Sequence, residues 1–250
     1  MTNTRDSVWP EPERAPRRRP RAVVWAACIA SLVSVVVADF AAAAAAGDSW
    51  AYRVANGYNR EVQGRVQYRV EKVEADRVTV LVTPDVAALG RPRTEIYTAD
   101  GNWLRHPLVN HDQAVEYEFA QPYPAFVFPL DPGKSWSLRV NATNPASGRR
   151  ASVRVDGEVM GTERVTVPAG AFDTIKVKRR IYAGDWEGPR SETNITETDW
   201  YAPALGRVVR SERTSGYMDT NRCSDEMSAC TPVRGDWHII ELVEAGAAAR

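Results

Sequence analysis

The stretch 161–212 constrains the fold more than any other part of this 250-residue chain, because it reads as strands joined by tight turns. A strand over 163–167 must end at Pro168, since proline has no N–H for the ladder and fixes φ. Proline in second place and Gly170 in fourth fit a type I turn. Over 172–182 apolar side chains then alternate with polar and basic ones, which indicates a half-buried returning strand.

The same pattern continues to the end of the stretch. We predict a strand over 191–201, a reversal over 202–206 that contains Pro203 and Gly206, and a returning strand over 207–214. Together with the first pair, these segments form an antiparallel meander.

Two parts of this meander, VPAGAFDT and WYAPALGRVVRSE, resemble bacterial envelope proteins of the DUF3108 type. They also resemble the wider group with folds like LolA and LolB, the lipoprotein carriers. The residues that carry the resemblance are turn formers and aromatic residues: Pro168, Gly170, Trp200, Tyr201, Pro203 and Gly206. The motif covers roughly fifty residues. The resemblance implies a LolA-like fold and a place in the cell envelope.

The rest of the chain after residue 46 reads as further short strands with few or no helices. Alternation or apolar runs predict strands over 48–54, 62–70, 78–82, 94–97, 103–105, 114–119, 135–140, 151–159 and 237–243. One helical turn over 85–89 is the exception. We therefore predict an all-β protein of ten to twelve mainly antiparallel strands. Such a sheet curls or splits into a sandwich; long strands with polar outer faces, and the resemblance, favour one strongly curved sheet or a partly open barrel.

Residues 1–46 have the organisation of a secretory signal. A basic region (1–21) precedes an uncharged apolar run (22–38), and small residues with Ala-x-Ala triplets follow. We expect cleavage and a single domain over 47–245 in the periplasm, with a disordered tail over 246–250. One alternative is that 22–38 stays as an inner-membrane anchor, which would be the only membrane contact; lipidation at Cys28 is another.

Charge balance argues against nucleic acid as a partner. Without its first 46 residues the chain keeps 26 of its 32 basic and 28 of its 32 acidic side chains, so it has no basic field. Cys223 and Cys230 flank six residues of a polar segment, and in an oxidising compartment we expect them to form a structural disulfide.

No catalytic or metal-binding pattern emerges. His106 and His111 lie in HPLVNHD, which we interpret as a polar connecting loop because no second cluster completes a metal shell. The carboxylate pairs Glu116/Glu118 and Glu197/Asp199 share a strand face at i, i+2 and are expected on the solvated outer face. We therefore expect no enzyme, no metal and no cofactor.

Aromatic residues give the functional hypotheses. Candidates for an aromatic inner face that binds a ligand are Trp50, Tyr52, Tyr68, Phe126, Trp136, Phe172, Tyr182, Trp200 and Trp237. The proline-aromatic segment 121–130 cannot be an interior strand and would form a lid. One hypothesis is a carrier or sensor that takes a lipid, an acyl chain or a lipoprotein segment on its concave face. The other is a module that binds envelope proteins through an exposed sheet edge, with these aromatic residues filling its core.

Overall fold

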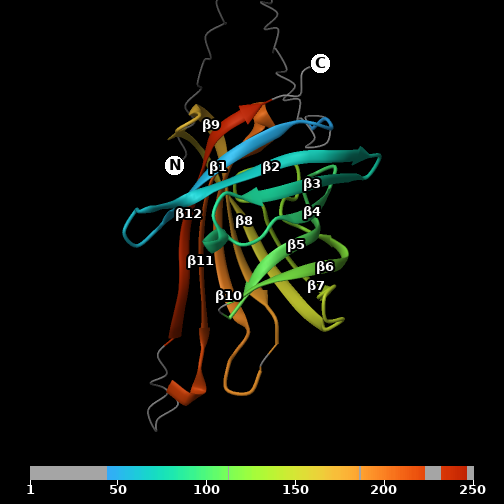
Figure 1. Ribbon diagram of the computed structural model, residues 1–250, viewed down its shortest axis with the longest axis vertical. Coiled ribbons are helices and arrows are strands. Elements are labelled where there is room, and N and C mark those ends of the chain that lie inside the picture. The colour runs from blue at the N-terminus through green and yellow to red at the C-terminus, as the bar shows by residue number, and fades with distance from the viewer. Residues whose placement is uncertain (1–43, 112, 186, 223–231, 247–250) are drawn as a thin grey trace, which may run out of the picture. The chain divides into compact units, whose positions relative to one another are not determined.

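A computed structural model describes residues 44–111, 113–185, 187–222 and 232–246. Within these ranges twelve strands follow one another in antiparallel pairs, and β1 pairs with both β2 and β12, so the sheet closes into a barrel (Figure 1). The strands are β1 (Ser49–Asn56), β2 (Val62–Glu74), β3 (Arg77–Pro84), β4 (Arg93–Thr98), β5 (Trp103–Asn110), β6 (Gln113–Tyr123), β7 (Ser135–Thr143), β8 (Arg150–Val167), β9 (Gly170–Ala183), β10 (Thr193–Ala202), β11 (Arg207–Met218) and β12 (Pro232–Gly246). The predicted all-β antiparallel fold is confirmed.

Helical structure in the described residues is limited to three short 3₁₀ turns, η1 (Ala87–Leu89), η2 (Pro203–Leu205) and η3 (Thr220–Arg222). No helix in the described ranges has the length and apolar character that a membrane span requires. The turn η2 follows the predicted reversal, because proline occupies its first turn and Gly206 ends it in the left-handed region at φ 61°. The expected turn between β8 and β9 is also present, at Pro168 and Ala169.

Strand β8 is longer than predicted. The sequence indicated separate strands over 151–159 and 163–167, but one strand runs from Arg150 to Val167. Its register against β9 shifts between Val159 and Gly161, and Gly161 has φ 137°. A glycine bulge therefore bends the strand where the sequence pattern changes phase, without ending it.

Apolar side chains on one face of each strand fill the barrel in two clusters. In β3, for example, Val78, Val80 and Val82 are completely buried, as the alternation predicted. One cluster is built around Trp50, Tyr52 and the β3 valines, and the other around Trp103, Tyr117, Tyr123 and the buried valines of β7 to β9.

Three buried charged side chains, Arg179, Glu197 and Asp199, form an ion-pair network inside the barrel. Arg179 of β9 donates to Glu197 at 2.8 Å and to Asp199, both on β10, and Arg213 of β11 pairs with the other oxygen of Glu197. Glu197 is completely buried and Asp199 nearly so, hence the prediction that this carboxylate pair lies on the solvated outer face is wrong. Two arginines on the neighbouring strands compensate the carboxylates, and these partners cannot be seen from β10 alone.

A second buried carboxylate, Glu95 of β4, accepts hydrogen bonds from Arg93 and Tyr97 and lies 3.1 Å from Nδ1 of His106. His106 stacks on Trp103 with ring centroids 3.9 Å apart. The segment around His106 and His111 is therefore largely strand β5 with both imidazoles buried, and the prediction of a polar connecting loop is wrong. The buried carboxylate and the stacked ring provide the polar and apolar contacts that a buried histidine needs.

The connection from β6 to β7, residues 124–134, is called the plug here. Ala125, Phe126 and Leu130 are buried, and the rings of Phe126 and Phe128 pack against Tyr201. Arg179 donates to the carbonyl of Ala125 at 2.9 Å. The segment is ordered and lies outside the strands, as its prolines indicated, but it packs into the core instead of covering it as a lid.

Gly157 provides a prediction about the packing of β7 on β8. A Cβ at this position would lie 2.2 Å from the indole ring of Trp136, its register partner. We expect Gly157→Ala to destabilise the fold by about 1–3 kcal/mol, because the indole must move. Urea unfolding measures the loss. The same substitution in a Trp136→Ala background should cost far less, and equal costs in both backgrounds would contradict the contact.

Candidate functional site

Five of the nine predicted aromatic candidates lie in the barrel interior and contact one another or the backbone. Trp50 stacks on Tyr68 at 5.6 Å, and the Tyr52 hydroxyl donates to the carbonyl of Val208 at 2.6 Å. The Trp136 indole donates to the carbonyl of Pro124 at 3.0 Å, and Phe126 packs against Tyr201 as described above. Burial raises the pKa of both Tyr52 and Tyr68 far above the ordinary tyrosine value.

Of the other four candidates, two lie under guanidinium groups and two belong to or pack against the first cluster. Tyr182 lies beneath the guanidinium of Arg154, and Trp237 beneath that of Arg60. Trp200 is a buried member of the first cluster with Trp50 and Tyr52; Lys176 and Arg210 lie over its ring, and its indole donates to Glu163. Phe172 packs against the same cluster. The structure thus distributes the aromatic residues over several places, and ligand binding by them stays a prediction.

The barrel wall is least complete at two seams, one between β4 and β5 and one between β6 and β7, each with only two residue pairs. Strands β6 and β7 pair only at Glu118 with Thr143 and at Phe119 with Ala142. Beyond these two pairs β6 turns toward β5, where Tyr123 pairs with Trp103, and the plug packs into the space between the strands. From Ser135 to Val140, therefore, β7 has register partners only in β8.

The hydrogen bonds between β7 and β8 show which backbone N–H and C=O groups of β7 point toward β8 and which point away. The Val159 N–H donates to the Lys134 carbonyl at 2.8 Å, and the β7–β8 register is unbroken. Because backbone groups alternate between the two sides of a strand, those of Ser135, Ser137 and Arg139 point away from β8. No backbone hydrogen bond joins these three residues to any described residue across the seam. We call 135–140 the free edge.

The free edge is also accessible. Ser135, Ser137 and Arg139 are exposed, and Leu138 keeps 40% of its surface open although its partner Val155 is completely buried. The side chains of Ser137 and Arg139 bond to Asp156 and Ser152 of β8, so they leave the opposite side open. The prolines of 121–130 were the sequence signal for this seam, but they did not indicate which strand loses its partner.

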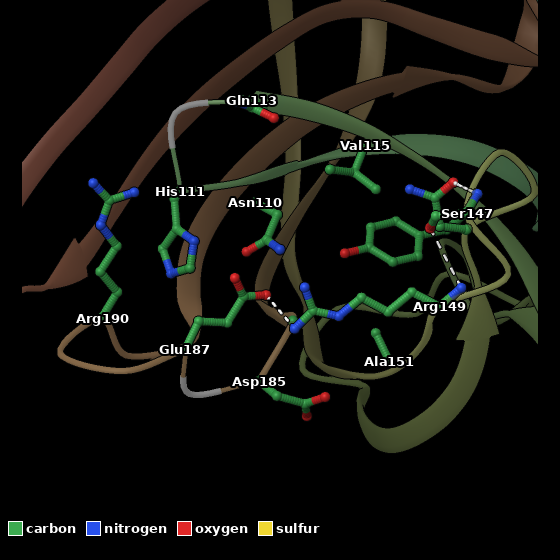
Figure 2. A pocket seen from close by; sticks show the side chains of 13 residues that line it. Asn110, His111, Gln113, Val115, Ser147, Arg149, Ala151, Asp185, Glu187 and Arg190 are labelled. Atoms are coloured by element: carbon green, nitrogen blue, oxygen red, sulfur yellow. Dashed lines mark hydrogen bonds and ion pairs between the residues drawn. The ribbon is translucent and has the colours of Figure 1, made fainter.

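A polar pocket of about 380 Å³ lies at the barrel end where β5–β6, β7–β8 and β9–β10 are connected (Figure 2). It is lined by Asn110, His111, Gln113, Val115, Tyr117, Asn144, Ser147, Arg149, Ala151, Gly184, Asp185, Glu187 and Arg190. None of the nine aromatic candidates lines it. The sequence analysis missed this site because its residues belong to three connections and the adjoining strand ends, which only the closed barrel brings together.

Contacts fix the inner wall of this pocket. His111 has φ 53°, its backbone N–H donates to Thr193, and its Nε2 lies 2.9 Å from the Ser191 carbonyl. A side chain on Gly184 would collide with the Asn110 amide. Across the pocket, Arg149 and Glu187 form an ion pair at 2.7 Å (Figure 2). Burial, with Glu187 next in effect, raises the pKa of Tyr117.

Metal-binding side chains do not assemble in the part of the chain that the structure describes. No group of three histidine, cysteine or acidic side chains there could hold a metal ion. His106 and His111 have separate partners, Glu95 and Ser191. The predicted secretory signal and the predicted disulfide between Cys223 and Cys230 lie outside the described residues.

Similar solved structures come from three bacteria, and their names describe them as exported proteins or lipoproteins. They are an exported protein with a YmcC-like fold from Bacteroides fragilis (18% identity, TM-score 0.47, covering 81% of this chain and 97% of that one) and a lipoprotein from Parabacteroides distasonis (18%, 0.49, 81% and 96%). A third is the lipoprotein YmcC from Escherichia coli (15%, 0.38, 84% and 90%). At these values the likeness carries no conclusion about function.

No curated protein matches the chain significantly. A family model does match part of the chain, over strands β7 to β11, and the matched range contains the meander 161–212. The model of the DUF3108-like family matches residues 134–218, and this match confirms the predicted resemblance to DUF3108-type proteins.

Proposed function

We propose that this is a non-enzymatic protein of the bacterial cell envelope that binds an extended segment of a partner protein along the free edge of β7. The observation that carries the proposal is the seam, where β6 and β7 share only two residue pairs. An unpaired strand edge offers N–H and C=O groups to a strand from another chain, a common mode of peptide recognition. Six residues of free edge correspond to about 20 Å of extended peptide.

Side chains around the edge give this interaction its selectivity. On the inner face of β7, Trp136 is half-buried and Leu138 is exposed, so apolar side chains of the added strand would be covered there. On the outer face Arg139 is exposed and favours an acidic neighbour. The expected partner segment alternates apolar and polar residues and carries an acidic residue on its polar face.

The carrier hypothesis has less support. Trp50 stacks on Tyr68 and the Tyr52 hydroxyl is bonded, while Phe126 lies in the plug that occupies the second cluster. These side chains already have the contacts that a lipid or acyl chain would need to replace. A lipoprotein segment, in contrast, could bind at the free edge as any extended peptide would. Export rests on the signal-like order of residues 1–46.

Proline substitutions test the edge directly. In Ser137→Pro the lost N–H points away from β8, so we expect the fold to persist and binding of a partner strand to fall at least about tenfold. In the matched control Leu138→Pro the lost N–H bonds to β8, and we expect strong destabilisation. Peptides selected from a display library against the full chain supply the ligand, and calorimetry measures their affinity. Selected peptides that bind Ser137→Pro unchanged would contradict the proposal.

A further inference from the structure

The polar pocket lies outside the free edge, since none of residues 135–140 lines it. Its volume of about 380 Å³ falls within the range of small-molecule sites in proteins.

Charge is balanced in this pocket. Four charged side chains line it, the guanidinium groups of Arg149 and Arg190 and the carboxylates of Asp185 and Glu187. Arg149 is paired with Glu187 at 2.7 Å, and Arg190 lies over the Tyr217 ring at 5.5 Å, at the margin of the view in Figure 2. The two positive and two negative side chains give the lining no net charge, which favours a neutral ligand over a charged one.

Hydrogen-bonding groups of both kinds face the same space. Tyr117 is 98% buried, yet no hydrogen bond from the described residues reaches its hydroxyl, which can donate and accept. Carboxylate oxygens of Asp185 and Glu187 accept, and the amides of Asn110 and Gln113 do both. Ligand groups that match such a mixture are themselves donors and acceptors, and the hydroxyl group is the simplest of them.

Apolar surface accompanies these groups. The Val115 and Ala151 side chains and the Tyr117 ring belong to the same lining. The partly buried Val115 and Ala151 side chains can contact C–H groups of a sugar ring while its hydroxyl groups bond to the surrounding amides and carboxylates. We propose that this pocket binds a neutral, hydroxyl-rich ligand, namely a short saccharide.

Binding measurements on the full chain test the proposal. The probes are the neutral disaccharides maltose, cellobiose and sucrose, with butylamine and acetate as charged probes, followed by isothermal titration and by ¹H–¹⁵N NMR. We expect at least one disaccharide to bind with a Kd of about 0.1–1 mM and to shift the backbone signals of Asn110 and Tyr117. Raising the salt concentration should leave that Kd unchanged, because a neutral ligand is not screened.

Tyr117→Phe removes only the unpartnered hydroxyl and should weaken disaccharide binding about three- to tenfold. Tyr58→Phe is the matched control, since Tyr58 is exposed and outside the pocket, and it should leave the Kd unchanged. Circular dichroism checks that both variants fold. The proposal is overturned if no disaccharide binds at about 10 mM. It is equally overturned if only a charged probe binds with a salt-dependent Kd, or if Tyr117→Phe binds the disaccharide as tightly as the wild type.

Discussion

Replacing Arg179 with leucine is expected to destabilise the barrel by about 3–5 kcal/mol, the cost of leaving a buried charge without its partner. Arg179 is 2% exposed and donates hydrogen bonds to Glu197 and Asp199. Without Arg179, neither solvent nor another side chain could fully compensate the negative charge of these two carboxylates. The carboxylates raise the pKa of Arg179 above its ordinary value, although burial by itself lowers it. The substitution also removes the bond to the Ala125 carbonyl that holds the plug.

Urea unfolding monitored by tryptophan fluorescence measures this loss. Arg164→Leu is a suitable control. Arg164 and Asp173 form an ion pair at 2.8 Å, the same distance as between Arg179 and Glu197, but 64% and 83% of their side chains are exposed. That change should cost less than about 1 kcal/mol. If Arg179→Leu were no more destabilising than Arg164→Leu, the buried network would not support the fold as described.

Acid is expected to unfold the protein between pH 4.5 and pH 2. Burial by itself raises the pKa of Glu95 and Glu197, but His106 and Arg93 lower that of Glu95 from 4.5 to about 2, and Arg213 and Arg179 lower that of Glu197 likewise. Because the folded pKa lies below the unfolded one, each carboxylate stabilises the fold above pH 4.5 and loses that contribution as pH falls toward 2. The loss is on the order of 3 kcal/mol for each group.

Urea midpoints measured between pH 6 and pH 2 test this window. Glu95→Gln should lower stability at pH 7, because Arg93 loses its charged partner, and should flatten the acid part of the profile. A wild-type midpoint that stays constant from pH 5 to pH 2, or a Glu95→Gln profile as steep as that of the wild type, would show that these carboxylates are not linked to folding in this way.

Local patterns were sufficient for much of the fold. Alternation gave the strand of Val78, Val80 and Val82, and proline and glycine gave the turns at Pro168 and Gly206, because these signals depend only on neighbours in the chain. The same reasoning failed where partners come from distant strands. Glu197 and Asp199 alternate like surface residues, and only the register with Arg179 and Arg213 makes their burial possible.

The candidate sites were less predictable for the same reason. The prolines of 121–130 correctly indicated that 124–130 lies outside the strands, but residues 121–123 belong to β6. The free edge arises because β6 leaves β7 after Phe119 and turns toward β5, which the prolines did not indicate. The polar pocket depends on three turns that meet at one barrel end, so no single segment carries its pattern. In the sequence, Tyr117 in particular has the pattern of an ordinary core residue of β6.

Amide hydrogen exchange along β7 is the most direct test of the free edge. In the free protein, the amides of Ser137 and Arg139 should exchange rapidly, while those of Trp136, Leu138 and Val140, which point to β8, should be protected. A bound peptide should then protect Ser137 and Arg139 as well. Uniform protection along β7 without any peptide, or a peptide that leaves both amides exchanging rapidly, would contradict binding by strand addition at this edge.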